Sequence, residues 1–104
     1  MYLPKKYTNF KKAFPEIFKH YDALGRTCRD AGPLDGKAQS LVKLGIAVGA
    51  GSRGAVMSHT RKALDEGVSA DEVRHAILMA LSTLGFPHMI AAMSWADEVI
   101  ESKD

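Results

Sequence analysis

Apolar residues recur at helical spacing in every long segment of this chain between residues 14 and 100. Ile17, Tyr21, Leu24 and Cys28, for example, follow one another at intervals of four, three and four positions, which places them on one face of a helix. No segment shows the alternating pattern of a half-buried strand. The spacing therefore predicts an all-α helical bundle of five main helices, over residues 14–30, 35–49, 52–66, 69–84 and 87–100.

Capping residues indicate where these helices begin and end. Pro15 stands at a first helical position, where its missing N–H does no harm. Ser52 is a predicted N-cap, and Ser69 with Glu72 forms a predicted capping box. Gly67 stands where a helix needs a left-handed C-terminal cap.

The N-terminal segment, residues 1–13, carries paired lysines and turn-forming residues without an obvious helical repeat. We predict an extended, solvated arm for this segment. The remainder, residues 14–104, is short enough for one helical domain around a single hydrophobic core.

Composition excludes several classes of function. The 14 basic and 12 acidic residues leave a net charge of only +2, without the dense basic stripe of a nucleic-acid-binding protein. No apolar run approaches the roughly 18 residues that span a membrane, and the N-terminus lacks a signal-peptide hydrophobic region. We therefore expect a cytoplasmic protein that binds neither nucleic acid nor membrane.

The single cysteine, Cys28, excludes an intramolecular disulfide, a CxxC redox pair and a multi-cysteine zinc site. Its position on an apolar stripe favours a small buried hydrophobe over a nucleophile. The histidines show neither HxxxH nor HExxH spacing, so we expect no metal site.

The predicted helix 35–49 is apolar over most of its circumference. Such a helix belongs inside a bundle or at a subunit contact, so we expect the chain to form homo-oligomers. Its apolar and small residues include Ala38, Leu41, Val42, Gly45, Ile46 and Val48.

Three motifs, in chain order, resemble the carboxymuconolactone decarboxylase family, which includes the alkylhydroperoxidase D-like proteins. They are "GPLD" (32–35), His59 followed by "ALDEG" (63–67), and "SADEVRHAI" (69–77), and the resemblance extends over about residues 32–92. It implies an all-α fold, chemistry without a cofactor, and assembly as homotrimers or homohexamers. It also implies that His59 is the functional histidine.

The chain departs from the redox branch of that family, which carries CxxCxxxH at this helix. Ser52 and Ala55 occupy the two cysteine positions, and the position of the accompanying acid falls near Ser40. A dithiol peroxidase needs a thiolate and a resolving thiol, and serine cannot form the disulfide intermediate. The resemblance therefore favours a branch that lacks the CxxC pair.

His59 is the candidate catalytic residue, as a general acid/base on a small carboxylated or lactone-like substrate. The alternative is a buried histidine that only packs against a neighbouring helix. His75 could line a cleft with His59 or lie at a subunit contact, and His88 could be a second acid/base group or a structural residue. The candidate pocket residues are Ser52, Ser58, His75 and His88.

Two functions remain open from the sequence. One is a cofactor-free, lyase-like enzyme of the carboxymuconolactone decarboxylase type. The other is a non-catalytic oligomer that uses the same fold for assembly or for binding a small ligand.

Overall fold

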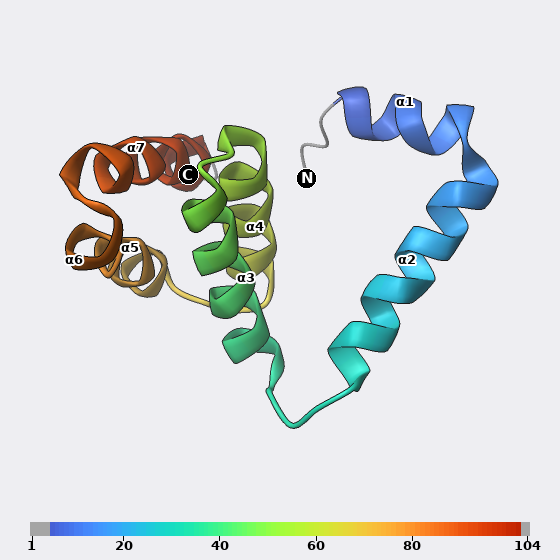
Figure 1. Cartoon of the computed structure of the whole chain (residues 1–104), viewed down its shortest axis with the longest axis horizontal. Helices are drawn as coiled ribbons and strands as arrows, with labels where there is room; N and C mark the ends of the chain where they lie inside the picture. The colour runs from blue at the N-terminus through green and yellow to red at the C-terminus, as the bar shows by residue number, and fades with distance from the viewer. Residues whose placement is uncertain (1–4, 103–104) are drawn as a thin grey trace. The chain divides into compact units, whose positions relative to one another are not determined.

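A computed structural model describes residues 5–102, and all regular structure within that range is helical. The elements are α1 (Lys5–Ala13), α2 (Pro15–Asp30), α3 (Gly36–Ala50), α4 (Arg53–Asp65), α5 (Ala70–Leu78), α6 (Leu81–Leu84) and α7 (Phe86–Ser102) (Figure 1). The all-α prediction is confirmed. No helix within the described range combines the length and the apolar character that crossing a membrane requires.

The chain divides into two compact units at the turn that contains Gly32 and Pro33. The first unit ends at Pro33 and contains α1 and α2. The second unit begins at Leu34 and contains α3 to α7.

The predicted extended arm is wrong over Lys5–Ala13, which forms α1; residues 1–4 lie outside the described range. Aromatic residues at helical intervals explain the helix. The ring centroids of Tyr7 and Phe18 lie 5.5 Å apart, as do those of Phe10 and Phe14, and the Lys11 ammonium lies 5.2 Å from the Phe18 ring. The prediction of an extended arm rests on the lysine pairs and overlooks the helical spacing of these aromatic residues.

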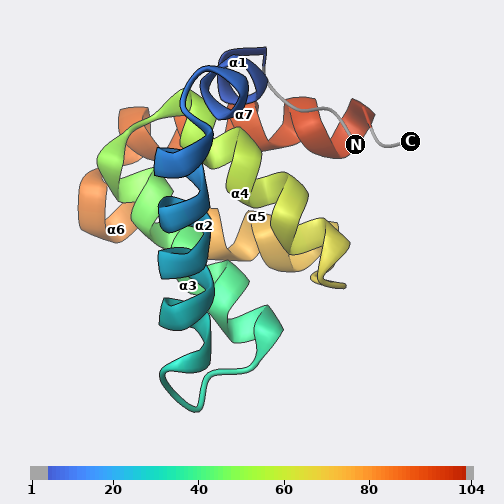
Figure 2. The ribbon, with the colours of Figure 1, turned by 90° about the vertical axis from the view of Figure 1, so that its right-hand side faces the viewer.

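α1 and α2 meet at an angle at Phe14 (Figures 1 and 2). Phe14 has φ −133° and ψ 66°, a conformation outside the helical region. The cause is Pro15, whose ring disfavours a helical conformation in the residue before it. Pro15 then occupies the first position of α2, as predicted.

In the second unit, side-chain caps set the start of three helices. Asp35 Oδ1 accepts from Ala38 N at 2.8 Å and opens α3. Ser69 and Glu72 form the reciprocal capping box at α5 that the sequence predicts. The left-handed cap predicted at Gly67 is confirmed by its φ of +92°.

One predicted helix, 69–84, is divided into α5 and α6. At the junction the Ala80 N–H donates to Ile77 O at 2.9 Å, a tighter bond than the α-helical pattern, and Ala80 is buried. Neither Met79 nor Ala80 is a helix breaker. Packing on α7, which both α5 and α6 contact, therefore decides this break.

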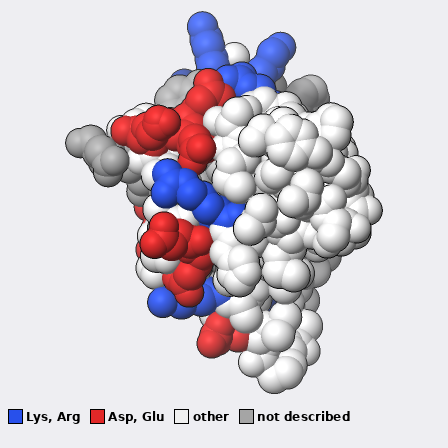
Figure 3. All heavy atoms as spheres, turned by 90° about the vertical axis from the view of Figure 1, so that its left-hand side faces the viewer, with Lys and Arg blue, Asp and Glu red and all other residues white. Residues whose placement is uncertain are grey.

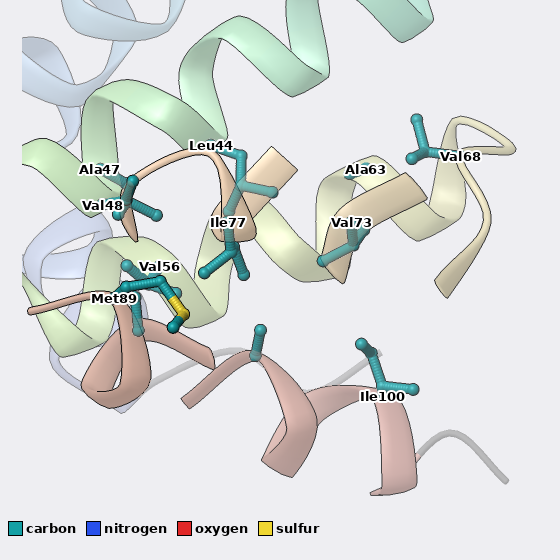
Figure 4. Packing of buried hydrophobic residues seen from close by; sticks show 13 residues of the cluster. Leu44, Ala47, Val48, Val56, Ala63, Val68, Val73, Ile77, Met89 and Ile100 are labelled. Atoms are coloured by element: carbon teal, nitrogen blue, oxygen red, sulfur yellow. The ribbon is translucent and has the colours of Figure 1, made fainter. Parts of the chain in front are cut away.

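The hydrophobic core of the second unit is built by α3, α4, α5 and α7, whose buried side chains point toward one another (Figure 4). α3 and α4 lie side by side, and α7 packs against α4 and α5 (Figure 1). The fully buried side chains include Leu44, Val56, Val73 and Ile77. This core holds α4, and therefore His59, in a fixed position.

Candidate functional site

The turn between α3 and α4 places the candidate site. Gly51 ends α3 with φ +68°, a left-handed conformation that favours glycine. Ser52 follows at once as the N-cap of α4, and its Oγ accepts from Ala55 N at 3.3 Å. The predicted N-cap is confirmed. The hydroxyl of this pocket candidate therefore already has a structural role.

His59 lies in the middle of α4, next to the helix face that enters the core. Val56, Thr60 and Ala63 form that face and are fully buried, whereas His59 is only half-buried. The imidazole therefore lies at the border between the core and the surface. That position allows a small molecule to reach it while the core holds its helix in place.

The pKa of His59 is lowered from its ordinary value of 6.5. Partial burial is the largest cause, because it disfavours the charged imidazolium; the positive charges of Lys62 and Lys43 lower the pKa further. Lys62 is one turn along α4, and Lys43 comes from α3, which packs on α4. At neutral pH the imidazole is therefore uncharged and lies in a positive electrostatic environment.

His88 has a structural role. Its Nε2 forms a hydrogen bond with Val48 O, one of the last carbonyl groups of α3. Since a carbonyl can only accept, Nε2 carries the proton. The same ring lies beside Gly51, where an added Cβ would come within 3.5 Å of it. His88 thus links the first turn of α7 to the end of α3.

Two further candidates are Ser58 and His75. Ser58 is half-buried on α4, and His75 is exposed on α5. Among the residues that the structure describes, no hydrogen bond joins His59 to Ser52 or Ser58, or to His75 or His88. Within residues 5–102, no three His, Cys, Asp or Glu side chains form a group that could hold a metal ion.

The prediction that Cys28 is a buried hydrophobe is wrong. The residue is exposed on α2, in the first unit, with a free thiol. Its neighbours on the same stripe, Tyr21 and Leu24, are exposed as well. The stripe does lie on one face of a helix, as predicted, but that face is not buried within the described structure.

Sequence reasoning missed two buried polar residues beside His59. Arg61 is only 7% exposed and Thr60 is fully buried; the Thr60 hydroxyl has no hydrogen-bond partner among the described residues. A signal for Arg61 was present, because it lies four positions after Met57 and three before Leu64. That spacing places its side chain on an apolar side of α4, although "TRKALD" reads as a solvated segment.

Comparison with known proteins identifies the class of the chain. The sequence model of the carboxymuconolactone decarboxylase family matches residues 15–98, which include α2 to α6 and most of α7. The chain therefore belongs to the carboxymuconolactone decarboxylase family. Neither the curated proteins nor the solved structures contain a match to it.

Proposed function

We propose that this protein is a cofactor-free enzyme of the carboxymuconolactone decarboxylase type, with His59 as its general acid/base. The observation that carries the proposal is the state of His59: a half-buried, neutral imidazole near two lysines, on a helix fixed by the core. A neutral imidazole can accept a proton from a substrate at physiological pH. Membership in the carboxymuconolactone decarboxylase family supports this type of reaction.

The proposed substrate is a small carboxylated or lactone-like molecule. Lys43 and Lys62 provide positive charge beside His59, which favours a substrate carboxylate there. In a decarboxylation the carbon–carbon bond to the carboxylate breaks, carbon dioxide leaves, and the electron pair remains on the substrate carbon. The proton for that carbon comes from the imidazolium that forms when His59 first takes a proton from another acidic C–H or O–H group of the substrate, since the ionised carboxylate has none to give. The pair of transfers leaves His59 neutral again.

A dithiol peroxidase is not the proposed activity. The helix that would carry the cysteine pair has Ser52 as its N-cap and Ala55 one turn later. Neither side chain can form a disulfide. Cys28 is exposed on a different helix, and we expect its alkylation to leave any peroxidase rate unchanged.

The enzymatic proposal is tested by His59→Gln and His59→Ala on a panel of carboxylated lactones, with carbon dioxide release as the readout. We expect kcat to fall by about 10²–10⁴-fold, the usual contribution of general acid–base catalysis. His20→Ala is the matched control, because His20 is exposed on α2, and it should retain full activity. Equal activity of the wild type and both His59 variants would overturn the proposal.

A second candidate function is a non-catalytic oligomer that binds a small ligand or serves only assembly. The structural roles of two pocket candidates favour it, because Ser52 caps α4 and His88 binds the end of α3. If His59→Ala destroys the oligomer and no panel member is turned over by the wild type, this candidate replaces the enzyme. For either function we propose assembly with copies of the same chain, as a homotrimer or homohexamer.

A further inference from the structure

α3 and α4 pack side by side and antiparallel, and contacts at both ends fix their register (Figure 1). Gly51 and Ser52 form the short turn that joins them. At the other end the Glu66 carboxylate lies against Gly36, where an added Cβ would come within 2.6 Å of Glu66 Oε2. Residues at equal distances in sequence from the turn are therefore opposite one another along the pair.

This register brings polar residues together in the middle of the α3–α4 contact. Lys43 lies opposite His59, because each is equally far from Gly51. By the same count, Ser40 lies opposite Lys62. Ser40 precedes Lys43 by three positions, so both lie on one side of α3, and His59 and Lys62 are related in the same way on α4. We call these four residues the seam cluster.

Lys43 is half-buried and has no counter-ion among the residues that the structure describes. Glu66 lies at the start of α3, two turns or about 10 Å along the helix from Lys43. A charge that loses water without gaining a partner destabilises a protein. The Lys43 ammonium is therefore suited to bind an anion that the chain itself does not supply.

Several other charged groups of the second unit are paired. Arg74 Nε lies 3.0 Å from Asp97 Oδ1, and Arg53 Nη2 lies 2.9 Å from Glu98 Oε2. On the face shown in Figure 3, acidic and basic side chains lie next to one another. The two charged groups that act on His59, in contrast, are both positive. The seam cluster is thus a local excess of positive charge within a chain whose net charge is only +2.

We propose that the seam cluster binds one carboxylate group, with Lys43 as the residue that binds it and Ser40 as a second donor. An ammonium group has three N–H donors and a hydroxyl has one, so the two carboxylate oxygens can accept from both side chains. The Ser40 hydroxyl is half-buried and has no hydrogen-bond partner among the described residues. Lys62 contributes less, because its side chain is exposed and water screens its charge.

Taking this carboxylate to be part of the substrate rests on the proposed function. In that case Lys43 and His59 have different tasks, since Lys43 binds and orients the substrate and His59 transfers the proton. Lys43 then determines specificity, because a neutral amide or ester of the same substrate loses the ion pair.

The test measures the binding of benzoate to the full chain by NMR of the His59 imidazole, with benzamide as the neutral counterpart. Benzoate should bind the wild type with a Kd on the order of 1–10 mM, and benzamide at least about tenfold more weakly. Bound benzoate should also raise the pKa of His59, because a nearby negative charge favours the imidazolium. Lys43→Met should weaken benzoate binding by at least about tenfold, the effect of losing one charge-assisted hydrogen bond. Lys43→Arg keeps the charge and should retain most of the affinity.

Lys37→Met is the matched control, because Lys37 is on the same helix but lies beside Gly67, at the far end from the cluster. It should bind benzoate as the wild type does. Ser40→Asp places a carboxylate inside the cluster and should abolish binding. Circular dichroism shows whether each variant keeps its helices, and if Lys43→Met does not, Ser40→Asp decides the outcome. Unchanged benzoate affinity in the deciding variant, or an equal loss in Lys37→Met, would overturn the inference.

The carboxylate site and the catalytic role of His59 can fail separately. If Lys43→Met loses benzoate binding while both His59 variants keep full turnover, the site stands and the proposed catalytic role is wrong. If the His59 variants lose turnover while Lys43→Met binds benzoate as the wild type does, the catalytic role stands and the site is wrong.

Discussion

The two units of this chain are equally helical, yet they differ in how they bury apolar surface. In the unit of α1 and α2, Phe18 is the one buried residue among those described. In the unit of α3 to α7, thirteen buried residues form a continuous core. Helical spacing of apolar residues is present in both units. It predicts which face of a helix is apolar, but not whether another helix covers that face.

The two units also differ in how their helices begin. α3, α4 and α5 each start with a side chain that accepts a backbone hydrogen bond, whereas Phe14 at the start of α2 provides none. Among the residues that the structure describes, the N-terminal unit therefore lacks a continuous core, and α2 lacks this local stabilisation. Short helices without tertiary packing are marginal in water. Its apolar stripe, with Ile17, Tyr21 and Leu24 at 58–66% exposure, adds little buried surface to stabilise it.

The largest expected effect is a difference in helix content between the two units when each is produced as a separate fragment. Residues 34–104 alone should retain most of their helix content, because they contain the complete core. Residues 1–33 alone should be largely unfolded. Far-ultraviolet circular dichroism of both fragments measures this. A cooperative thermal transition in the 1–33 fragment would contradict the comparison.

The next effect compares one buried and one exposed isoleucine. Ile77→Ala removes a fully buried side chain and should lower the free energy of unfolding by about 2–5 kcal/mol. Ile17→Ala, at a 58% exposed position, should change it by less than about 0.5 kcal/mol. Urea denaturation at one fixed protein concentration gives both values. A large loss for Ile17→Ala would show that the α2 stripe is covered in solution.

Capping residues should have a smaller effect. Ser69→Ala removes half of the capping box of α5 and should cost about 1 kcal/mol. Ser102→Ala is the control: the Ser102 hydroxyl only bonds Val99 O, one turn earlier at the end of α7, and its loss should cost less than about 0.5 kcal/mol. Equal losses in urea denaturation would argue that the cap does not determine where α5 begins.

The smallest effect concerns His59 and pH. The pKa of His59 in the folded state lies below 6.5, its ordinary value. At a pH between the folded-state pKa and 6.5, the unfolded chain therefore binds more protons than the folded chain. The contribution of His59 is therefore fully present above pH 6.5 and is lost as the pH falls toward the folded pKa. His59→Gln should flatten this part of the stability curve relative to the wild type, as measured by urea denaturation from pH 5 to pH 8. An unchanged curve would mean that burial and Lys62 do not perturb the imidazole.

The same pKa predicts the pH dependence of catalysis, if His59 acts as a base. The value of kcat/KM should rise with pH as the free imidazole forms, with a midpoint below 6.5. Lys62→Met removes a positive charge and should move that midpoint upward, whereas Lys19→Met on α2 should leave it unchanged. A midpoint that does not respond to Lys62 would place the titrating group elsewhere.

Much of the fold and part of the candidate site can be predicted from local sequence. Ser52, Gly67 and the Ser69–Glu72 pair specify helix ends through contacts within a few residues. His59 is recognisable by its place on α4 and by family motifs. Arg61 was missed because its charge suggested solvent, although its spacing from Met57 and Leu64 indicates an apolar side of the helix. The role of His88 depends on Val48, forty positions away in sequence, and no local pattern reports it.

Local patterns in the sequence are enough to establish that this chain is all-helical, where most of its helices begin and end, and that His59 lies on a helix without a cysteine pair. These properties follow from spacing and capping, which act over one or two turns. Packing between helices sets the remaining features: α5 ends before α6, His88 binds the end of α3, and Cys28 and apolar side chains such as Met79 and Phe86 are exposed. Those outcomes depend on which helices pack together, because a helix that is apolar on one side does not specify its own partner.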